Sequence, residues 1–481
     1  MPAIKPFRPD LGELVSGTPA NVLANGNGYG PRPSLQTAPG AAALAAAPRG
    51  AFGAYLPDGL FRGFAATSTK VYTLGADFAF TALTPTFTVP ADDDEAMAQF
   101  GVFMLASNTT DGMYAYNIDT PAGLNAVSGA PAARYLFSAN NQVVALGAGS
   151  SLLNRLATSA FGSHTNWTSR GASKQDMSDG GAFTGGGDLG NGAAIVLQLR
   201  AVRRMSFGNA GGGALFRLDK LGDDVGCVHP RAQVTHNGVC YFLHSDGFYA
   251  CDGASAPVNI GAGKVNNWFL ARCADLKKVY FSIDPKNTLV RIRYAASGDG
   301  STATVYQSIL DYNYVTKEFI PGTEATSAIF RMGTPGYTLN TISSTFGVLN
   351  AWSQYPLDSA FWQGGSFRLA GLDATFKVGF FDGTPAAATL ETITDGDGMG
   401  YTVNACMPVT DDTAATVELG VKDRLADSFT WKTAEAMTET GIVPLRGTGK
   451  FQRYRVVHAA GGAWTRTSEV TGIDKQMDGP R

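Results

Sequence analysis

The chain has 481 residues, with 37 Lys and Arg against 40 Asp and Glu and a formal net charge of −3. This near-neutral balance argues against a protein that grips nucleic acid through phosphate neutralisation, and no apolar run reaches the roughly 18 residues of a membrane helix. Charged residues are only 16% of the chain and glycine occupies 59 positions, which predicts a turn-dense, β-rich globular protein. At roughly 150 residues per domain, we expect about three domains.

Residues 1–50 are dominated by Pro, Gly, Asn and Ala, and they carry too few large apolar side chains to form a core alone. We expect an extended N-terminal strap that packs on the rest of the chain or on a neighbouring subunit. No apolar stretch follows the basic residues near the N-terminus, so a soluble protein without a Sec-type export signal is expected. The side chains that we assign to an assembly contact in this strap are Val22, Leu23 and Tyr29.

From about residue 65 to 330, short apolar strands alternate with turns rich in Gly, Asp, Asn and Pro, so that hairpin follows hairpin. We expect a β-propeller over residues 51–355. Most of these turns recur roughly every 30 to 40 residues, the period of a β-propeller blade. The expected turns lie at 75–77, 110–112, 139–141, 245–247, 284–287 and 312–314. Residues 185–190 match Gly-x-Gly-x-x-Gly, but no predicted strand precedes them and no helix follows, so we interpret 180–192 as a loop.

The clearest hairpin lies between residues 239 and 251, and both of its faces are apolar. Such a hairpin must be covered on both sides, which suits a propeller blade between two others better than a half-solvated sheet. The residues that define it are Asp246, Gly247, Phe248 and Tyr249.

The cysteine pattern predicts free thiols. Five cysteines without any Cys-x-x-Cys argue against a disulfide framework and a structural zinc site. If Asp246-Gly247 is a two-residue turn, Cys240 lies opposite Gly253 and diagonal to Cys251. The Cα atoms of the two cysteines would then lie more than about 7 Å apart, beyond easy disulfide reach.

Residues 356–481 again have a strand-like pattern, and we expect a C-terminal β-sandwich. Their charge is segregated: 382–427 holds nine acidic and two basic residues, whereas 446–466 holds basic residues and no acidic one. Two interpretations stay open, an interface between subunits or charge pairing within the domain, and the second is the commoner outcome. The candidate contact residues of the basic stretch are Arg446, Arg453 and Arg455.

Motifs for catalysis are absent from the sequence. It contains no His-Glu-x-x-His, no Gly-x-Ser-x-Gly and no Walker A pattern. His229, His236 and His244 invite a metal interpretation with Cys240, but Cys240 and His244 would lie about 13 Å apart on one strand face. We therefore expect no enzyme activity, no cofactor and no metal.

Four stretches, in order along the chain, carry a family resemblance. They are an Asn-Val-Leu element leading to Gly-Tyr-Gly-Pro (20–33), a Gly-Cys-Val-His-Pro element leading to the 239–251 hairpin and 260–265, the segment 380–392, and 443–446 with 453–456 and 464–465. Together they resemble the tail nozzle, or tail hub, proteins of short-tailed double-stranded DNA bacteriophages, also called packaged-DNA stabilisation proteins.

The resemblance implies a β-propeller with further β domains, assembled as a homo-hexameric ring in the virion tail after synthesis in the host cytoplasm. Its implied partners are the portal-adaptor protein above and tail fibre, spike or needle proteins below. Double-stranded DNA would pass through the ring without sequence-specific binding, and no membrane insertion is implied. The ring would retain the packaged genome and serve as its conduit on ejection.

The alternative is a propeller that binds or cleaves glycans. Cleavage requires paired carboxylates, or a Tyr nucleophile with an Arg cluster, at the central end of the propeller, and the sequence alone does not assemble one. Binding would use exposed aromatic platforms, for which Trp167 and Trp268 are candidates, although burial in a blade is commoner.

Overall fold

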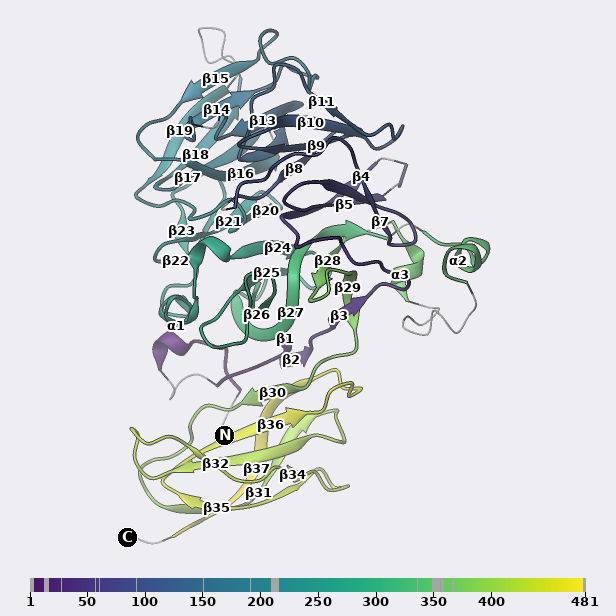
Figure 1. The fold of residues 1–481 in the computed structure, drawn as a ribbon. Coiled ribbons are helices and arrows are strands. Elements are labelled where there is room, and N and C mark those ends of the chain that lie inside the picture. Colours follow the sequence, from purple (N-terminus) through teal and green to yellow (C-terminus); the bar gives the residue numbers. More distant parts are fainter. Residues whose placement is uncertain are drawn as a thin grey trace.

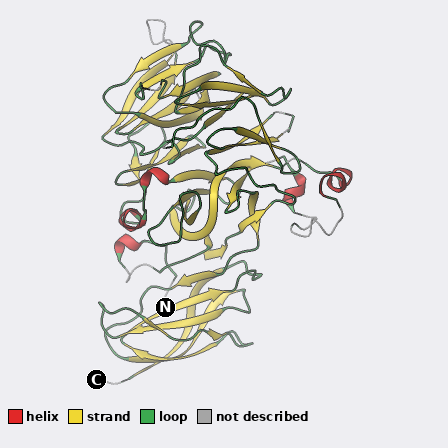
Figure 2. Cartoon of the chain, in the orientation of Figure 1, coloured by secondary structure: helices red, strands yellow, loops and turns green. Residues whose placement is uncertain are grey.

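The computed structural model describes residues 4–12, 17–26, 28–56, 58–59, 61–91, 93–149, 151–190, 192–208, 216–334, 336–347, 355, 359–365 and 367–478. They form a propeller above a smaller β-sandwich, with N-terminal strands between the two (Figure 1). Strands dominate, and short helices lie at the sides (Figure 2). The predicted fold class, an all-β propeller with an extended N-terminal strap and a C-terminal sandwich, is confirmed.

Five four-stranded antiparallel sheets follow one another along the chain, and each is one blade. Their strands are β4 (Gly50–Tyr55), β5 (Phe61–Ala66), β6 (Val71–Leu74) and β7 (Phe80–Ala82); β8 (Ala96–Phe100), β9 (Phe103–Asn108), β10 (Gly112–Asn117) and β11 (Leu124–Ala126); β12 (Tyr135–Ala139), β13 (Gln142–Leu146), β14 (Arg155–Thr158) and β15 (Ser173–Asp176); β16 (Phe183–Gly190), β17 (Ala193–Gln198), β18 (Ala201–Phe207) and β19 (Phe216–Asp223); β20 (Gln233–His236), β21 (Val239–His244), β22 (Gly247–Cys251) and β23 (Val258–Asn259).

A seven-stranded sheet supplies two further blades. Its strands are, in order, β24 (Tyr280–Asp284), β25 (Leu289–Tyr294), β26 (Tyr306–Asn313), β27 (Glu318–Gly333), β28 (Phe367–Asp373), β29 (Val378–Gly383) and β3 (Ser34–Thr37). The first part of β27 pairs with β26 as the outer strand of blade six. Its second part pairs with β28 as the inner strand of blade seven, and both pairings are irregular near Thr326.

Seven inner strands close the ring. Contacts run from β4 through β8, β12, β16, β20 and β24 to β27, and β27 returns to β4. The outer strand of blade seven is β3, which comes from the N-terminal strap and pairs Thr37 with Gly379. The propeller therefore has seven blades, and the strap completes the last one.

The sandwich consists of two five-stranded sheets. One contains β1 (Val22–Asn25), β2 (Gly28–Pro31), β37 (Thr467–Met477), β31 (Tyr401–Thr410) and β35 (Val443–Gly449); the other contains β30 (Ala388–Glu391), β36 (Phe451–His458), β32 (Thr416–Lys422), β33 (Thr430–Trp431) and β34 (Glu435–Ala436). Val22 is fully buried in the core between the sheets, Tyr29 is buried beside it, and Leu23 is half-buried. The strap thus packs on its own chain.

The boundary expected at residue 355 shifts toward the C-terminus. β28 and β29 belong to blade seven, because they lie in one sheet with its inner strand β27 and its outer strand β3. The sandwich begins at β30. Between β27 and β28 lie α2 (Leu339–Phe346) and α3 (Ala360–Gln363), and Phe361 and Trp362 of α3 pack with Tyr355 against blade seven. The strap therefore contributes strands to both domains: residues 20–31 pair with strands of the sandwich, and residues 34–37 pair with a strand of the propeller.

The hairpin of blade five differs from the predicted register by two residues, because its turn lies one residue earlier than expected. Cys240 lies directly opposite Cys251, and His244 pairs with Gly247, so the turn is Ser245-Asp246. Gly247 has a φ of +141°, and a Cβ there would lie 2.1 Å from the side chain of Asn266. The glycine is thus needed for this close contact with α1 (Asn266–Arg272) rather than for the turn. The predicted faces hold, and both thiols are free and buried.

The glycine-rich segment expected as a loop is β16, the inner strand of blade four. A Cβ on Gly187 would lie 2.4 Å from Thr235 Oγ1, and one on Gly185 would lie 2.9 Å from Gln233. Glycines lie here because side chains of β20, in the next blade, occupy the space beside the strand.

The remaining helices of the described residues are the 3-10 turns η1 (Pro9–Leu11) and η2 (Leu276–Lys278). None of the helices in the described ranges has the length and apolar character needed to span a bilayer.

Candidate functional site

A cavity of about 470 Å³ lies on the axis of the propeller. Each of the seven inner strands contributes to its wall, which combines apolar side chains such as Met97 and Phe281 with charged ones. Gly186 and Gly187 of β16 lie in the wall. The position suits a ligand site, because the centre of a propeller is where its blades converge.

Two ion pairs lie where the chain enters the inner strands. Asp93 and Asp94 directly precede β8, Arg134 precedes β12, and Arg231 precedes β20. Arg134 Nε lies 3.1 Å from Asp93 Oδ1, and Arg231 Nε lies 3.4 Å from Asp94 Oδ2. Burial raises the pKa of the Asp94 carboxyl, while the nearby guanidinium groups act in the opposite direction. This end of the cavity therefore carries balanced charge.

Two further titratable groups are buried beside these pairs. Glu95 accepts a hydrogen bond from Asn108 Nδ2 at 3.0 Å, and burial raises the pKa of its carboxyl to about 7. Burial, with a smaller effect of Arg134 and Arg231, lowers the pKa of His229 to about 3. His229 is therefore a neutral imidazole at neutral pH.

Arg331 of β27 also lies in the cavity wall. Its guanidinium lies 4.7 Å from the ring centre of Phe367, and burial lowers its pKa. The buried Nε of Arg331 has no hydrogen-bond partner among the described residues. The cavity thus contains a polar group that the protein itself leaves without a partner.

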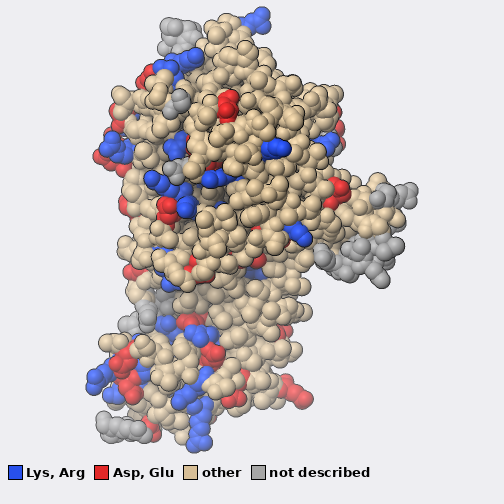
Figure 3. Space-filling model, viewed as in Figure 1, with Lys and Arg blue, Asp and Glu red and all other residues tan. Residues whose placement is uncertain are grey.

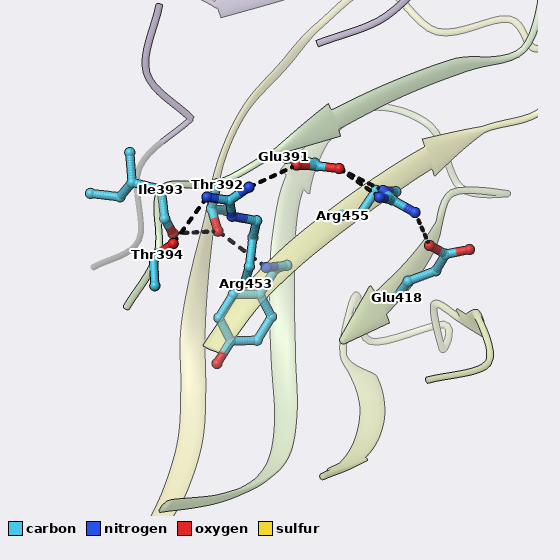
Figure 4. A network of polar contacts seen from close by, with 8 residues as sticks. Glu391, Thr392, Ile393, Thr394, Glu418, Arg453 and Arg455 are labelled. Atoms are coloured by element: carbon cyan, nitrogen blue, oxygen red, sulfur yellow. Dashed lines mark hydrogen bonds and ion pairs between the residues drawn. The ribbon is translucent and has the colours of Figure 1, made fainter. Parts of the chain in front are cut away.

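Arg453 and Arg455, predicted as contact residues, lie in the sandwich and not in the cavity. Both bind Glu391: Arg453 Nη1 lies 3.2 Å from Oε2, and Arg455 Nη2 lies 2.7 Å from Oε1 (Figure 4). Arg455 Nη1 also reaches Glu418 Oε2 at 2.8 Å, and Arg453 Nη2 donates to Thr394 Oγ1 at 3.0 Å. These arginines of the basic stretch therefore pair with acidic residues inside the domain, which is the second of the two interpretations of the segregated charge.

The other predicted residues also lie away from the cavity. Arg446 is exposed on β35 of the sandwich. The residues of the blade-five hairpin pack within their own blade: Phe248 is buried, and the Tyr249 hydroxyl donates to Asp246 Oδ2 at 2.9 Å. No group of three or more His, Cys, Asp or Glu suited to a metal ion occurs among the described residues.

The two candidate aromatic platforms pack against other parts of the chain. Trp167 is buried, and its Nε1 donates to the carbonyl of His164. Trp268 is partly buried, and its ring lies edge-on to Phe7 at 5.1 Å. The Arg272 guanidinium also lies over the Trp268 ring, 5.0 Å from its centre, so both rings serve packing within the chain.

The cavity residues were not predicted as a site. The one local signal is the acidic run Asp93-Asp94-Glu95 directly before an apolar strand, in a chain with few charges. The remaining groups come from segments far apart in the sequence, and only closure of the ring brings them together.

Comparisons with known proteins leave the family open. No family model matches the sequence, and no curated protein matches it. Among solved structures, the chain is similar to the WD40 repeats of RRP9, with 7% identity and a TM-score of 0.40 over 63% of this chain and 88% of that one. It is also similar to BBS1N in its complex with ARL6DN, with 9% identity and a TM-score of 0.41 over 73% of this chain and 97% of the other.

Proposed function

We propose that this chain is a structural subunit of the tail nozzle of a short-tailed double-stranded DNA phage. In this role it forms a homo-hexameric ring below the portal-adaptor protein, retains the packaged genome and serves as the conduit for its ejection. The proposal rests on the four ordered sequence stretches, and the strap supports it, because this one segment fastens the two domains to each other.

The strap contacts both domains through specific side chains. Asn21 Nδ2 donates to the carbonyl of Ala387 in the sandwich, and Asn21 Oδ1 accepts from the backbone N–H of Thr323 in the propeller. The buried Nε of Arg32 lies 3.6 Å from Asp311, which also binds Arg291 through two hydrogen bonds of 2.7 and 2.8 Å. A subunit built in this way transmits force between its domains, as a ring that holds a pressurised genome must.

The surface charge supports passage of DNA rather than binding. On the face drawn in Figure 3, acidic and basic side chains are interspersed, with wide areas of neither. With a net charge of −3, such a surface offers no continuous basic track for a phosphate backbone.

We further propose that the protein is not an enzyme. Asp93 and Asp94 are paired with arginines. Burial raises the pKa of Tyr135 to about 12, and its hydroxyl accepts a hydrogen bond from Gln233. A phenol with a raised pKa is a poor nucleophile at neutral pH, which argues against the glycan-cleaving alternative.

The test is the mass of the purified assembly, measured together with salt-titrated binding of duplex DNA. We expect a hexamer and weak DNA binding without a steep loss on adding salt. Substitution of both Arg453 and Arg455 with Glu should reduce folding or assembly without changing DNA affinity, because both side chains pair with Glu391. Arg446→Glu, at an exposed position of the same basic stretch, is the matched control and should fold normally.

Two results would contradict the proposal. One is a monomer at all concentrations, alone and with the adaptor protein. The other is tight, salt-sensitive DNA binding that the double substitution abolishes while the ring stays intact, which would indicate a DNA-gripping clamp.

A further inference from the structure

We propose that the axial cavity binds a small carboxylate of the sugar-acid type, with the carboxylate on Arg331. This binding site goes beyond the proposed tail role and does not depend on it.

Arg331 is held in place with its guanidinium uncompensated. The backbones of β27 and β4 touch beside it, since a Cβ on Gly53 would lie 2.2 Å from the carbonyl oxygen of Arg331. No carboxylate or carbonyl of the described residues pairs with its side chain, and the buried Nε lacks a hydrogen-bond partner. A mostly buried cation without a counterion is costly, and an anionic ligand removes that cost.

The other cations of the wall are already neutralised. Arg134 pairs with Asp93, and Arg231 pairs with Asp94 and also donates to the carbonyl of Glu95. Arg331 is thus the cation of the described wall that lacks an acidic partner. The planar guanidinium forms two parallel hydrogen bonds with a carboxylate, which matches a singly charged acid.

A carboxylate at the rim limits the charge of the ligand. Asp188 of β16 lies in the wall but is exposed, with Oδ1 accepting from the N–H of Gly190 at 3.0 Å. Its negative charge disfavours a second negative charge on the ligand, so a carboxylate is preferred over a phosphate dianion.

The cavity also has a suitable size and a suitable wall. The volume of about 470 Å³ is within the usual range for small-ligand sites, and the apolar wall suits the C–H faces of a sugar ring.

Isothermal titration calorimetry on the full-length protein tests the site. The probes are D-glucuronate, D-galacturonate and N-acetylneuraminate, with D-glucose and inorganic phosphate as comparisons at matched ionic strength. We expect saturable binding of at least one sugar acid and none of glucose. An oligogalacturonate arm distinguishes the source: equal affinity for the oligomer indicates the end of a glycan, whereas binding of the monomer alone indicates a free sugar acid.

Two variants locate the binding. Arg331→Met removes the charge while keeping an apolar stem over Phe367, and should weaken binding by at least about tenfold. Arg204→Met is the matched control, because Arg204 lies on β18 away from the cavity wall and its buried Nε also lacks a hydrogen-bond partner; its affinity should be unchanged.

Any of three results overturns the site. The folded wild type binds no sugar acid up to about 10 mM, or it binds glucose or phosphate as tightly as a sugar acid. The third is a folded Arg331→Met variant that binds the sugar acid with unchanged affinity. Circular dichroism checks the fold of each variant. If Arg331→Met does not fold, Arg331→Lys keeps the charge but loses the paired hydrogen bonds, and unchanged affinity in that variant also overturns the proposal.

Discussion

At the scale of single residues, Glu95 and His229 give the propeller opposite responses to pH. Burial raises the pKa of the Glu95 carboxyl and lowers that of the His229 imidazole. The folded protein therefore holds a proton on Glu95 that the unfolded chain releases, and lacks one on His229 that the unfolded chain takes up. Between about pH 4.5 and 6.5 the two contributions oppose each other, so only a single-residue variant separates them.

Glu95→Gln isolates the carboxyl. The folded pKa of about 7 lies above the ordinary value of 4.5, so the stabilising contribution of the protonated acid is complete below pH 4.5 and is lost as the pH rises through 7. The amide cannot ionise, and its advantage over the wild type should grow by about 2.5 kcal/mol between pH 5 and pH 8. Urea unfolding at both values measures this gain. Glu435→Gln, at an exposed position on β34, is the control; an equal difference at both pH values would refute the prediction for Glu95.

At the scale of elements, blade five is stabilised by rings that reach into its neighbours. The ring of Phe248 on β22 lies 4.7 Å from that of Phe269 on α1 and 5.4 Å from that of Phe319 on β27. With 1% of its surface exposed, Phe248 contributes both transfer free energy and packing.

Phe248→Ala should lower the free energy of unfolding by about 3 to 5 kcal/mol, since it leaves a cavity where three elements meet. Thermal or urea unfolding measures the loss. Val258→Ala, on β23 of the same blade and 60% exposed, should change stability by less than about 0.5 kcal/mol. A shift within error for Phe248→Ala would mean that the blade tolerates the cavity and that its core lies elsewhere.

Blades were predictable because their signals are local. The alternation of apolar residues in 239–251 assigned both faces correctly, but the register depended on Gly247, whose contact with Asn266 comes from a later helix. The strand β16 was missed for the same reason: glycines indicate a loop until the neighbouring Thr235 is known to occupy the space beside them.

The cavity and the domain boundary were beyond prediction for a physical reason. Arg331 and Thr235 belong to different blades, and no local pattern indicates which inner strands meet across an axis. The boundary at 355 was wrong because blade seven resumes after the insertion that contains α2 and α3. Pairing of Arg453 and Arg455 within the sandwich was one of the two interpretations of the segregated charges, and neither interpretation indicated the shared partner Glu391.

At the scale of the whole molecule, the strap joins two domains, and two truncations separate its parts. Deletion of residues 1–33 removes β1, β2 and Arg32 but leaves β3 in blade seven. We expect a destabilised sandwich, loss of the ring and loss of adaptor binding, with the propeller transition retained in calorimetry. Deletion of residues 1–38 also removes β3 and should lower the propeller transition. Oligomer mass and adaptor binding unchanged by the shorter deletion would disprove the assembly role of the strap.

The pairing of β3 with β29 sets the order in which a newly made chain matures. Thr37 leaves the ribosome early, whereas its partner Gly379 follows only after all the other blades have been translated. At about 5 to 20 residues per second, the N-terminal strand waits on the order of tens of seconds with its backbone groups unpaired. Until then the nascent chain exposes an open edge, which can pair with another chain. Completion of blade seven is consequently a late event in synthesis, and an oligomer that needs the finished propeller must form after it.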